Sequence, residues 1–515
     1  MITDTHSFYK NSTKLLLLQE ENMKKRILCM LLASMMFLAS CAESASNGDE
    51  TGSAADGTGA AAAETQPETE TEATPDLPEG LSFTGSSFTF GVMDNPNARN
   101  MIVMEEITGD ALNDAQYNII ESAANQLDVE IKQHVVTSSY PGTDQVRNMI
   151  AAGDDSLQVV NVFCVAAPTL LAEGYLRDYA DVPYIDLSKP WWDSRVNEAL
   201  ELGGLRYAAI GDLSITTHDL TYILLFNTEL INNHQLERPY DLVFSGEWTM
   251  DKMAEMMNIA RRDTDGDGNM GPKDTYGYLA HPKMVLPSFW IGAGETSMTM
   301  NTEGVPELTV TDERFLSVFD KIFEITYGME TYLVSSGNDV PQTNIDMFQQ
   351  GQSLFMDCSL FWAGSLRDME TDFGIIPYPK YDSTQELYNC RVSYYMPPVL
   401  PTTIQNLDMV GAVLELTNYL AKKEVTPAYI EGALKGKYAR DEESIAMIDL
   451  ILSNRVVDLG DTLYCSNVRD GFFAGMFSNK NQNLTSQVKT VEKILKRSVE
   501  KSVAAIKEQL GAAEE

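Results

Sequence analysis

Basic residues are scarce in this chain, and cysteines are few. Its 515 residues contain 37 Lys and Arg against 75 Asp and Glu, which gives a formal net charge of −38 at pH 7. Such an acidic surface repels the phosphate backbones of nucleic acids, so we expect no nucleic-acid partner. The 6 cysteines do not form the pattern of a disulfide framework. One or two bridges among Cys164, Cys358, Cys390 and Cys465 stay open.

Catalytic motifs are absent from the sequence as well. It contains no GxxxxGK[ST] loop and no GxSxG turn, so it predicts neither an ATPase nor an α/β-hydrolase. Its 5 histidines have no partner at metal-ligand or catalytic-triad spacing. Carboxylate pairs are too common in so acidic a chain to support or to exclude a glycosidase pair. We therefore expect a binding protein rather than an enzyme.

The N-terminal segment is typical of an exported lipoprotein. From Met23, a basic cluster precedes an apolar run that is too short to span a membrane comfortably. Leu38-Ala39-Ser40-Cys41 then resembles a bacterial lipobox, in which Cys41 is lipidated and becomes the first mature residue. An ordinary signal peptide that contains a cysteine is the alternative. Residues 1–22 do not fit a signal, and we hypothesise that translation starts at Met23.

Residues 42–80 predict a flexible acidic tether. The segment consists mainly of Ala, Gly, Ser, Thr and Glu and carries no basic residue, so it cannot bury a core. No later run of 18 apolar residues occurs. The only membrane contact that we expect is the lipid anchor, on the outer face of the cytoplasmic membrane.

The remainder, residues 81–515, predicts a mixed α/β protein. Strand-like segments at 87–93, 129–136 and 157–165 alternate with helix-like segments at 113–127 and 144–154, which indicates a doubly wound sheet. From Thr485 onward, apolar residues form one helical stripe. We expect this C-terminal helix to dock onto the body of the protein, with a membrane-surface helix as the alternative.

The stretch "DTDGDGNMGPKD", residues 263–274, matches a 12-residue calcium loop of the EF-hand type. Its ligands would come from Asp263, Asp265, Asp267, Asn269 and Asp274. A glycine stands at position 6, where the backbone must turn sharply, and the closing residue is aspartate where glutamate is usual. The loop occurs once, which argues for a structural staple and against a calcium sensor or a docking module. An acidic surface turn without metal is the alternative, and calcium against magnesium stays open.

Four stretches resemble the extracellular solute-binding lipoproteins of bacterial ABC importers, family 1, the sugar-binding type. They are "LRDYADVPYIDLSKPWWD", "LLFNTELINNHQLERPYDLVFSGEWTMDKM", the calcium loop with its following "TYGY", and "MFQQGQSLFMDCSLFWAGSLRDMETDFGIIPYPKYD". The resemblance spans roughly residues 82–510. It implies a two-lobed periplasmic-binding-protein-like fold of type II, with a hinge between the lobes and a helix-rich second lobe. The first lobe would take about 81–210 and 340–395, and the second about 211–339 and 396–515.

The resemblance also implies a function, which is to capture a sugar between the lobes and deliver it to ABC permease subunits. We expect the protein to act as a monomer. Sugar rings stack on flat aromatic side chains, and their hydroxyl groups bind carboxylates and amides. The candidate stacking residues are Trp191, Trp192, Trp290 and Trp362, and the candidate polar partners are Asp357 and Asn161. Asn161 stands where many members carry an aspartate-led strand, which puts the first-lobe contacts in doubt.

Two other functions stay open from the sequence alone. An exported glycan hydrolase would show turnover of oligosaccharides. A cell-surface docking protein would carry the calcium loop twice, and here it occurs once. The sequence does not name the sugar.

Overall fold

The computed structural model describes residues 73–95, 98–137, 141–333, 340–366, 369–430 and 442–513. Residues 72–515 belong to one compact unit. Cys41 and the proposed signal lie outside the described residues. The end of the predicted tether differs from expectation, because Asp76 lies 2.9 Å from the Lys189 ammonium and Leu77 packs against the core. The folded body therefore begins before residue 81.

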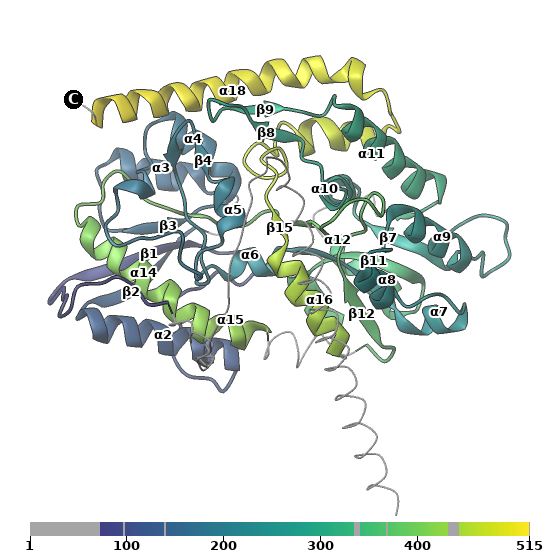
Figure 1. Cartoon of the computed structure of the whole chain (residues 1–515), viewed down its shortest axis with the longest axis horizontal. Coiled ribbons are helices and arrows are strands. Elements are labelled where there is room, and N and C mark those ends of the chain that lie inside the picture. The colour runs from purple at the N-terminus through teal and green to yellow at the C-terminus, as the bar shows by residue number, and fades with distance from the viewer. Residues whose placement is uncertain are drawn as a thin grey trace, which may run out of the picture. The chain divides into compact units, whose positions relative to one another are not determined.

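The strands form two main sheets (Figure 1). The first has the order β14-β3-β1-β2, with β1 Ser87–Met93, β2 Glu130–Thr137, β3 Val159–Asn161 and β14 Pro398–Val399. The second has the order β10-β7-β11-β6-β12, with β6 Tyr222–Asn227, β7 Tyr276–Ala280, β10 Tyr332–Leu333, β11 Ser353–Ser359 and β12 Phe373–Ile376. Short two-stranded ladders join β4 Glu201–Leu202 to β5 Leu205–Arg206, β8 Met298–Met300 to β9 Pro306–Leu308, and β13 Cys390–Arg391 to β15 Arg455–Val456.

Helices cover both sheets, as expected for a mixed α/β protein. The bounds up to the middle of the chain are α2 Ala111–Leu127, α3 Thr143–Ala151, α4 Ala167–Ala172, α5 Ser194–Glu198, α6 Ile215–Asp219, α7 Thr228–Asn233, α8 Pro239–Ser245, α9 Met250–Ala260 and α10 Pro282–Gly292. The later bounds are α11 Glu313–Phe323, α12 Val340–Gln349, α13 Leu360–Ala363, α14 Leu407–Lys423, α15 Val425–Pro427, α16 Glu442–Ser453, α17 Ala474–Ser478 and α18 Leu484–Ala513.

The first lobe is the first sheet with its helices. β1 pairs in parallel with β2 and β3, and β14 closes the sheet as an antiparallel edge beside β3. Helices α2 and α14 pack together below the sheet in Figure 1, and α3 and α4 lie above it. The predicted strand-helix-strand-helix-strand order of this lobe is confirmed.

The second lobe is the second sheet with its helices. Its strands β7, β10 and β11 run in parallel, whereas β6 is antiparallel to both β11 and β12. Trp248 is fully buried before α9, where its indole N–H donates to the Pro377 carbonyl oxygen at 3.0 Å. Thr249 caps α9 by accepting the Lys252 backbone N–H through its hydroxyl oxygen.

The predicted lobe boundaries are wrong in the second half of the chain. Strands β11 and β12, which the prediction assigned to the first lobe, pair with β6 and β7 in the second sheet. Strand β14 and helix α14, which it assigned to the second lobe, complete the first. A buried strand is apolar on both faces whichever sheet it joins, so its sequence does not reveal its neighbours.

Helix α18 docks onto the body, which confirms the expectation for its apolar stripe. Val488, Leu495 and Val503 are buried, and α18 packs along α4 in Figure 1. The Ser502 hydroxyl donates to the Pro168 carbonyl oxygen at 3.1 Å. None of the described helices is long and apolar enough to cross a bilayer.

Candidate functional site

Ligands of open α/β sheets bind outside the carboxyl ends of the parallel strands. In the first sheet, β3 ends at Asn161. In the second sheet, β11 ends at Ser359, and the short helix α13 follows it directly. Asp357 lies in β11 and Trp362 in α13, so both are close in the chain to the carboxyl end of this central strand.

Trp362 is the predicted stacking residue whose ring stays accessible. It lies in α13 and is only partly buried. The neighbouring Phe361 ring meets it edge-on, with centroids 5.6 Å apart and an interplanar angle of 88°. Trp362 also packs partly against the hydrophobic core, and its exposed part is the surface available for stacking on a flat partner.

Asp357 lies opposite Leu224 in the ladder between β11 and β6, close to the hinge. Its Oδ1 accepts a hydrogen bond from the Tyr378 hydroxyl at 2.7 Å, and the hydroxyl groups of Tyr378 and Tyr278 are 3.0 Å apart. Burial raises the pKa of the Asp357 carboxyl to about 6, although the Tyr378 hydrogen bond and the Arg391 charge oppose that shift. The carboxylate therefore lies in a weakly hydrated setting, where it accepts from the Tyr378 hydroxyl and from the His281 backbone N–H.

A buried arginine pair beside this edge was not predicted. Arg391 makes two hydrogen bonds to Asp461, at 2.6 and 2.8 Å, and lies 4.1 Å from the centroid of the Tyr222 ring. The guanidinium of Arg469 also donates to Asp461, at 3.0 Å. No sequence pattern links these residues, which come from β13, β6 and the chain after β15. They join β13, β6 and the chain after β15, and the charge of Arg391 opposes the rise in the pKa of Asp357.

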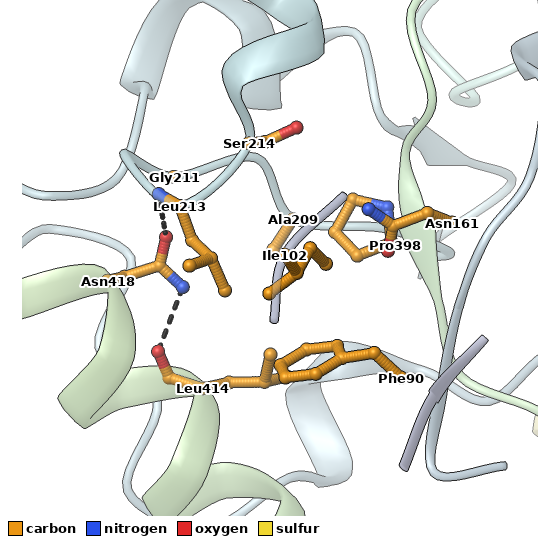
Figure 2. Close-up of a pocket in the computed structure, with 10 residues that line it drawn as sticks. All are labelled: Phe90, Ile102, Asn161, Ala209, Gly211, Leu213, Ser214, Pro398, Leu414 and Asn418. Carbon is orange, nitrogen blue, oxygen red and sulfur yellow. Dashed lines mark hydrogen bonds between the residues drawn. The ribbon is translucent and has the colours of Figure 1, made fainter. Parts of the chain in front are cut away.

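Asn161 lies in a small cavity of the first lobe (Figure 2). The cavity has a volume of only about 20 Å³ and a mainly apolar lining, to which Phe90 and Leu414 contribute. Asn161 is 4% exposed, and its Oδ1 has no hydrogen-bond partner within the described residues. Asn418, on the other side of the cavity, accepts from the Leu213 backbone N–H at 3.0 Å. In this structure Asn161 faces a small apolar cavity at the carboxyl end of β3.

Of the other three predicted stacking residues, Trp191 and Trp290 have packing positions, whereas Trp192 lines an open cavity together with Asp193 and Arg195. Trp191 is 1% exposed and meets the Tyr419 ring at 5.2 Å. Trp290 is fully buried, and its indole N–H donates to Asp458 at 2.8 Å. Neither ring offers a free face, because the surrounding core covers both sides. Trp192, 5% exposed, donates to the Glu415 carboxylate at 3.0 Å.

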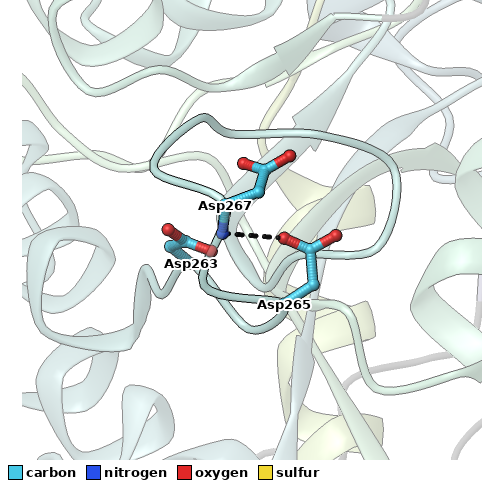
Figure 3. Close-up of side chains that lie close together, drawn as sticks. All are labelled: Asp263, Asp265 and Asp267. Carbon is cyan, nitrogen blue, oxygen red and sulfur yellow. Dashed lines mark hydrogen bonds between the residues drawn. The ribbon is translucent and has the colours of Figure 1, made fainter.

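The calcium loop lies between α9 and β7, and three of its carboxylates converge (Figure 3). Asp263, Asp265 and Asp267 each place an oxygen within 4.8 Å of the others, and all three are exposed. Asp263 accepts from the backbone N–H groups of Gly266 at 2.6 Å and Gly268 at 2.8 Å. Gly268 has φ +86°, so the position-6 glycine makes the predicted sharp turn.

The closing ligand of the loop does not join that group. Asp274 is 1% exposed, and its carboxylate accepts from the backbone N–H groups of Gly271 at 2.6 Å and Thr264 at 2.7 Å. These hydrogen bonds lower the pKa of Asp274. Asn269 donates its backbone N–H to Asp267 at 2.7 Å. Three carboxylate oxygens fit a hard cation, whereas Asp274 binds the loop backbone.

Comparisons with known proteins identify the fold. No protein-family model matches the chain, and no curated protein does. Among solved structures, UspC of M. tuberculosis matches with TM-score 0.54 and 13% identity over 81% of this chain and 100% of UspC. An ABC substrate-binding protein from Listeria monocytogenes in complex with cycloalternan matches with TM-score 0.52 and 11% identity over 80% of this chain and 99% of that one.

A third solved structure is similar to this chain over most of its length. A cyclo/maltodextrin-binding protein complexed with maltotetraose matches with TM-score 0.52 and 13% identity, covering 83% of this chain and 98% of the other. The chain thus has the two-lobed fold of periplasmic binding proteins, and the predicted fold class is confirmed.

Proposed function

We propose that this chain is the extracytoplasmic sugar-binding component of an ABC importer. The observation that supports this function best is Trp362, a partly buried indole ring in α13, directly after the carboxyl end of β11, the strand that carries Asp357. Solved proteins with the same fold include binders of cycloalternan and maltotetraose. Three of the four stretches that resemble this family lie in the second sheet with its helices and loops, and the fourth, residues 176–193, contacts β14 of the first sheet through Tyr179.

The two residues would divide recognition between the faces and edges of a sugar ring. The apolar C–H face of the sugar stacks on Trp362, and a hydroxyl group donates to Asp357. Ligand that contacts both lobes stabilises only the closed arrangement, so binding favours closure about the hinge segments. No residue in this arrangement needs to act as a catalyst, and an importer component releases its ligand unchanged.

The calcium loop would serve as a structural staple of the second lobe. The converging oxygens of Asp263, Asp265 and Asp267 would hold the ion, with Asn269 contributing its backbone carbonyl. Asp274 would have to leave its backbone hydrogen bonds in order to complete the ligand set, which would weaken the affinity for the ion.

Attachment to the membrane would come from a lipid on Cys41, and the acidic segment that follows would act as the tether. The partners would be a small carbohydrate and ABC permease subunits, and the protein would act as a monomer. Changing Cys41 to Ala should release the protein from membranes, which fractionation of cells detects. Continued membrane attachment of that variant would contradict the anchor.

A thermal-shift screen against a panel of neutral mono- and oligosaccharides tests the proposed function. We expect at least one sugar to raise the melting temperature, with no cleavage product on chromatography. Small-angle scattering should then show a smaller radius of gyration with that sugar bound. Release of shorter sugars would instead support the exported hydrolase, and a panel without any stabilising sugar would contradict the proposal.

A further inference from the structure

Two neighbouring cavities lie between the lobes, near the ladder of β13 and β15. Their volumes are about 430 and 310 Å³, and both are open to solvent. Arg195 from α5 and Arg455 from β15 line both cavities, so the two guanidinium groups lie where the cavities meet. The larger cavity is also lined by His218, Lys422 and Asp449.

These cavities lie on the other face of the hinge ladder from the proposed sugar site. In the parallel pairing, Cys390 lies opposite Arg455, and Arg391 lies opposite Val456. Successive side chains of a strand point to opposite faces, so Arg391 and Arg455 project in opposite directions. Arg391 contacts Tyr222 on the Asp357 side, whereas Arg455 contacts Asp193.

The positive charge of Arg195 has no carboxylate partner in the described part of the chain. Its Nη1 donates to the Asn454 amide oxygen at 2.9 Å, and its Nη2 donates to the Asn389 amide oxygen at 3.3 Å. A guanidinium offers five N–H donors, so three remain after these two bonds. Both amides are neutral, so they orient the guanidinium without cancelling its charge.

Arg455 has a spare donor as well. Its Nη2 lies 2.6 Å from the Asp193 carboxylate, and its Nη1 donates to the Thr217 hydroxyl at 3.3 Å. Its Nε is buried and has no partner within the described residues. Leaving a buried donor unpaired is costly, so this N–H calls for an acceptor that the described chain does not supply.

The acidic side chains of these cavities are either paired or exposed. Asp193 binds Arg455, and Asp212 accepts from the Thr426 hydroxyl at 2.6 Å. Glu198 and Asp449 are exposed at the rim. Burial first, and then the charges of Arg455 and Lys422, hold the pKa of His218 well below its usual value. The larger cavity is thus lined by three basic side chains, Arg195, Lys422 and Arg455, and by three carboxylates, so its charge is balanced within an acidic protein. Lys422 and Arg455 have carboxylate partners in Asp212 and Asp193, which leaves Arg195 as the basic side chain without one in the described part of the chain.

We propose that these cavities form an anion site, in which a ligand carboxylate lies between the guanidinium groups of Arg195 and Arg455. A carboxylate has acceptors only, and it matches the fork of N–H donors on a guanidinium. The ligand belongs to the class of small carboxylates, either free or as the acid group of a uronic sugar. The site is separate from the proposed sugar site, and its residues come from both sides of the hinge.

Calorimetry on the full mature chain at fixed ionic strength tests this proposal. The probes are galacturonate, galactose and acetate, with sodium chloride making up the ionic strength. We expect galacturonate to bind at least ten times more tightly than galactose at this site, since a charge-assisted bond contributes about a factor of ten or more. If acetate also binds, the ligands include free carboxylates. If acetate does not bind and galacturonate does, the ligand is the uronic sugar.

Variants locate the bound carboxylate. Arg195→Gln should weaken galacturonate binding about tenfold, whereas Glu198→Gln should tighten it, because that change removes a like charge at the rim. Asn389→Asp provides a second variant that keeps the arginine and neutralises it with a neighbouring carboxylate, and it should also weaken binding. Equal affinity for galacturonate and galactose, or wild-type affinity in both Arg195→Gln and Asn389→Asp, would overturn the proposal. The affinity of Arg195→Gln for the neutral sugar found in the screen tests the proposed importer function separately, because that sugar binds at the other site.

Discussion

Glu415, in α14 of the first lobe, is fully buried, and one of its carboxylate oxygens accepts the Trp192 indole N–H at 3.0 Å. The other oxygen has no partner within the described residues. Burial raises the pKa of Glu415 to about 7, against the opposing hydrogen bond from Trp192. The protonated form is therefore the one that the folded state prefers.

This preference predicts the pH dependence of stability. The folded pKa is raised above the ordinary value of 4.5, so the contribution of Glu415 is fully present below pH 4.5 and is lost as pH rises toward 7. Glu415→Gln removes the charge and keeps an acceptor for Trp192. At pH 8 the free energy of unfolding of Glu415→Gln should exceed that of the wild type by about 1–3 kcal/mol. This difference in stability should be smaller at pH 5.

Urea unfolding at both pH values measures this difference. Glu198→Gln is the matched control, because Glu198 is exposed and its change should alter stability by less than about 0.5 kcal/mol. Parallel stability profiles of wild type and Glu415→Gln across this pH range would contradict the assignment.

Trp362 provides the second prediction for a single residue. If its ring stacks on the sugar, Trp362→Ala should weaken binding of the sugar found in the screen by about a hundredfold, equivalent to a few kcal/mol. Trp362→Phe keeps a flat ring and should retain much of the affinity. Calorimetry measures sugar binding by both variants. Wild-type affinity in Trp362→Ala would show that the indole ring is not part of the sugar site.

At the scale of the element, the calcium loop depends on three converging carboxylates. Without a cation, Asp263, Asp265 and Asp267 repel one another, and a bound cation at 100 times its dissociation constant stabilises the folded state by about 2.7 kcal/mol. Chelation should therefore lower the melting temperature of the wild type. The Asp263→Ala variant should lose that response, and calorimetric titration with calcium and magnesium compares the two ions. Identical melting with and without chelator would leave the loop as a turn only.

Helix α18 allows a sharply matched comparison. Leu495 is 3% exposed and lies on the face of the helix that packs against the body, whereas its neighbour Ile494 is 51% exposed and lies on the solvent face. Leu495→Ala should destabilise the protein by about 2–5 kcal/mol, whereas Ile494→Ala should change it by less than about 0.5 kcal/mol. Equal effects in urea unfolding would mean that the stripe is not packed as described.

At the scale of the whole molecule, the sequence predicted the class of fold better than its division into lobes. Periodicity placed β1, α2 and β2 because local patterns determine them. Strand pairing is a long-range property, and β11 is apolar on both faces, so its assignment to the first lobe was wrong.

The candidate site shows the same limit. Tryptophan identity predicted four stacking residues, but burial leaves Trp191 and Trp290 in packed cores. Whether a ring ends in a core or at an edge depends on the neighbours that folding supplies. Arg195 and Arg455 gave no sequence signal, since the hinge brings them together from distant segments.

The edge strand β14 constrains the order in which this chain can fold. Pro398 pairs with Asn161, and every strand of the second sheet lies between them in the chain. Contacts of such high sequence separation form slowly. While the chain is emerging, β3 therefore presents an unpaired edge until the segment around Pro398 arrives, and unpaired edges favour aggregation. A chain cut before that segment would complete the second sheet and leave the first one open, so the N-terminal lobe is the later of the two to mature.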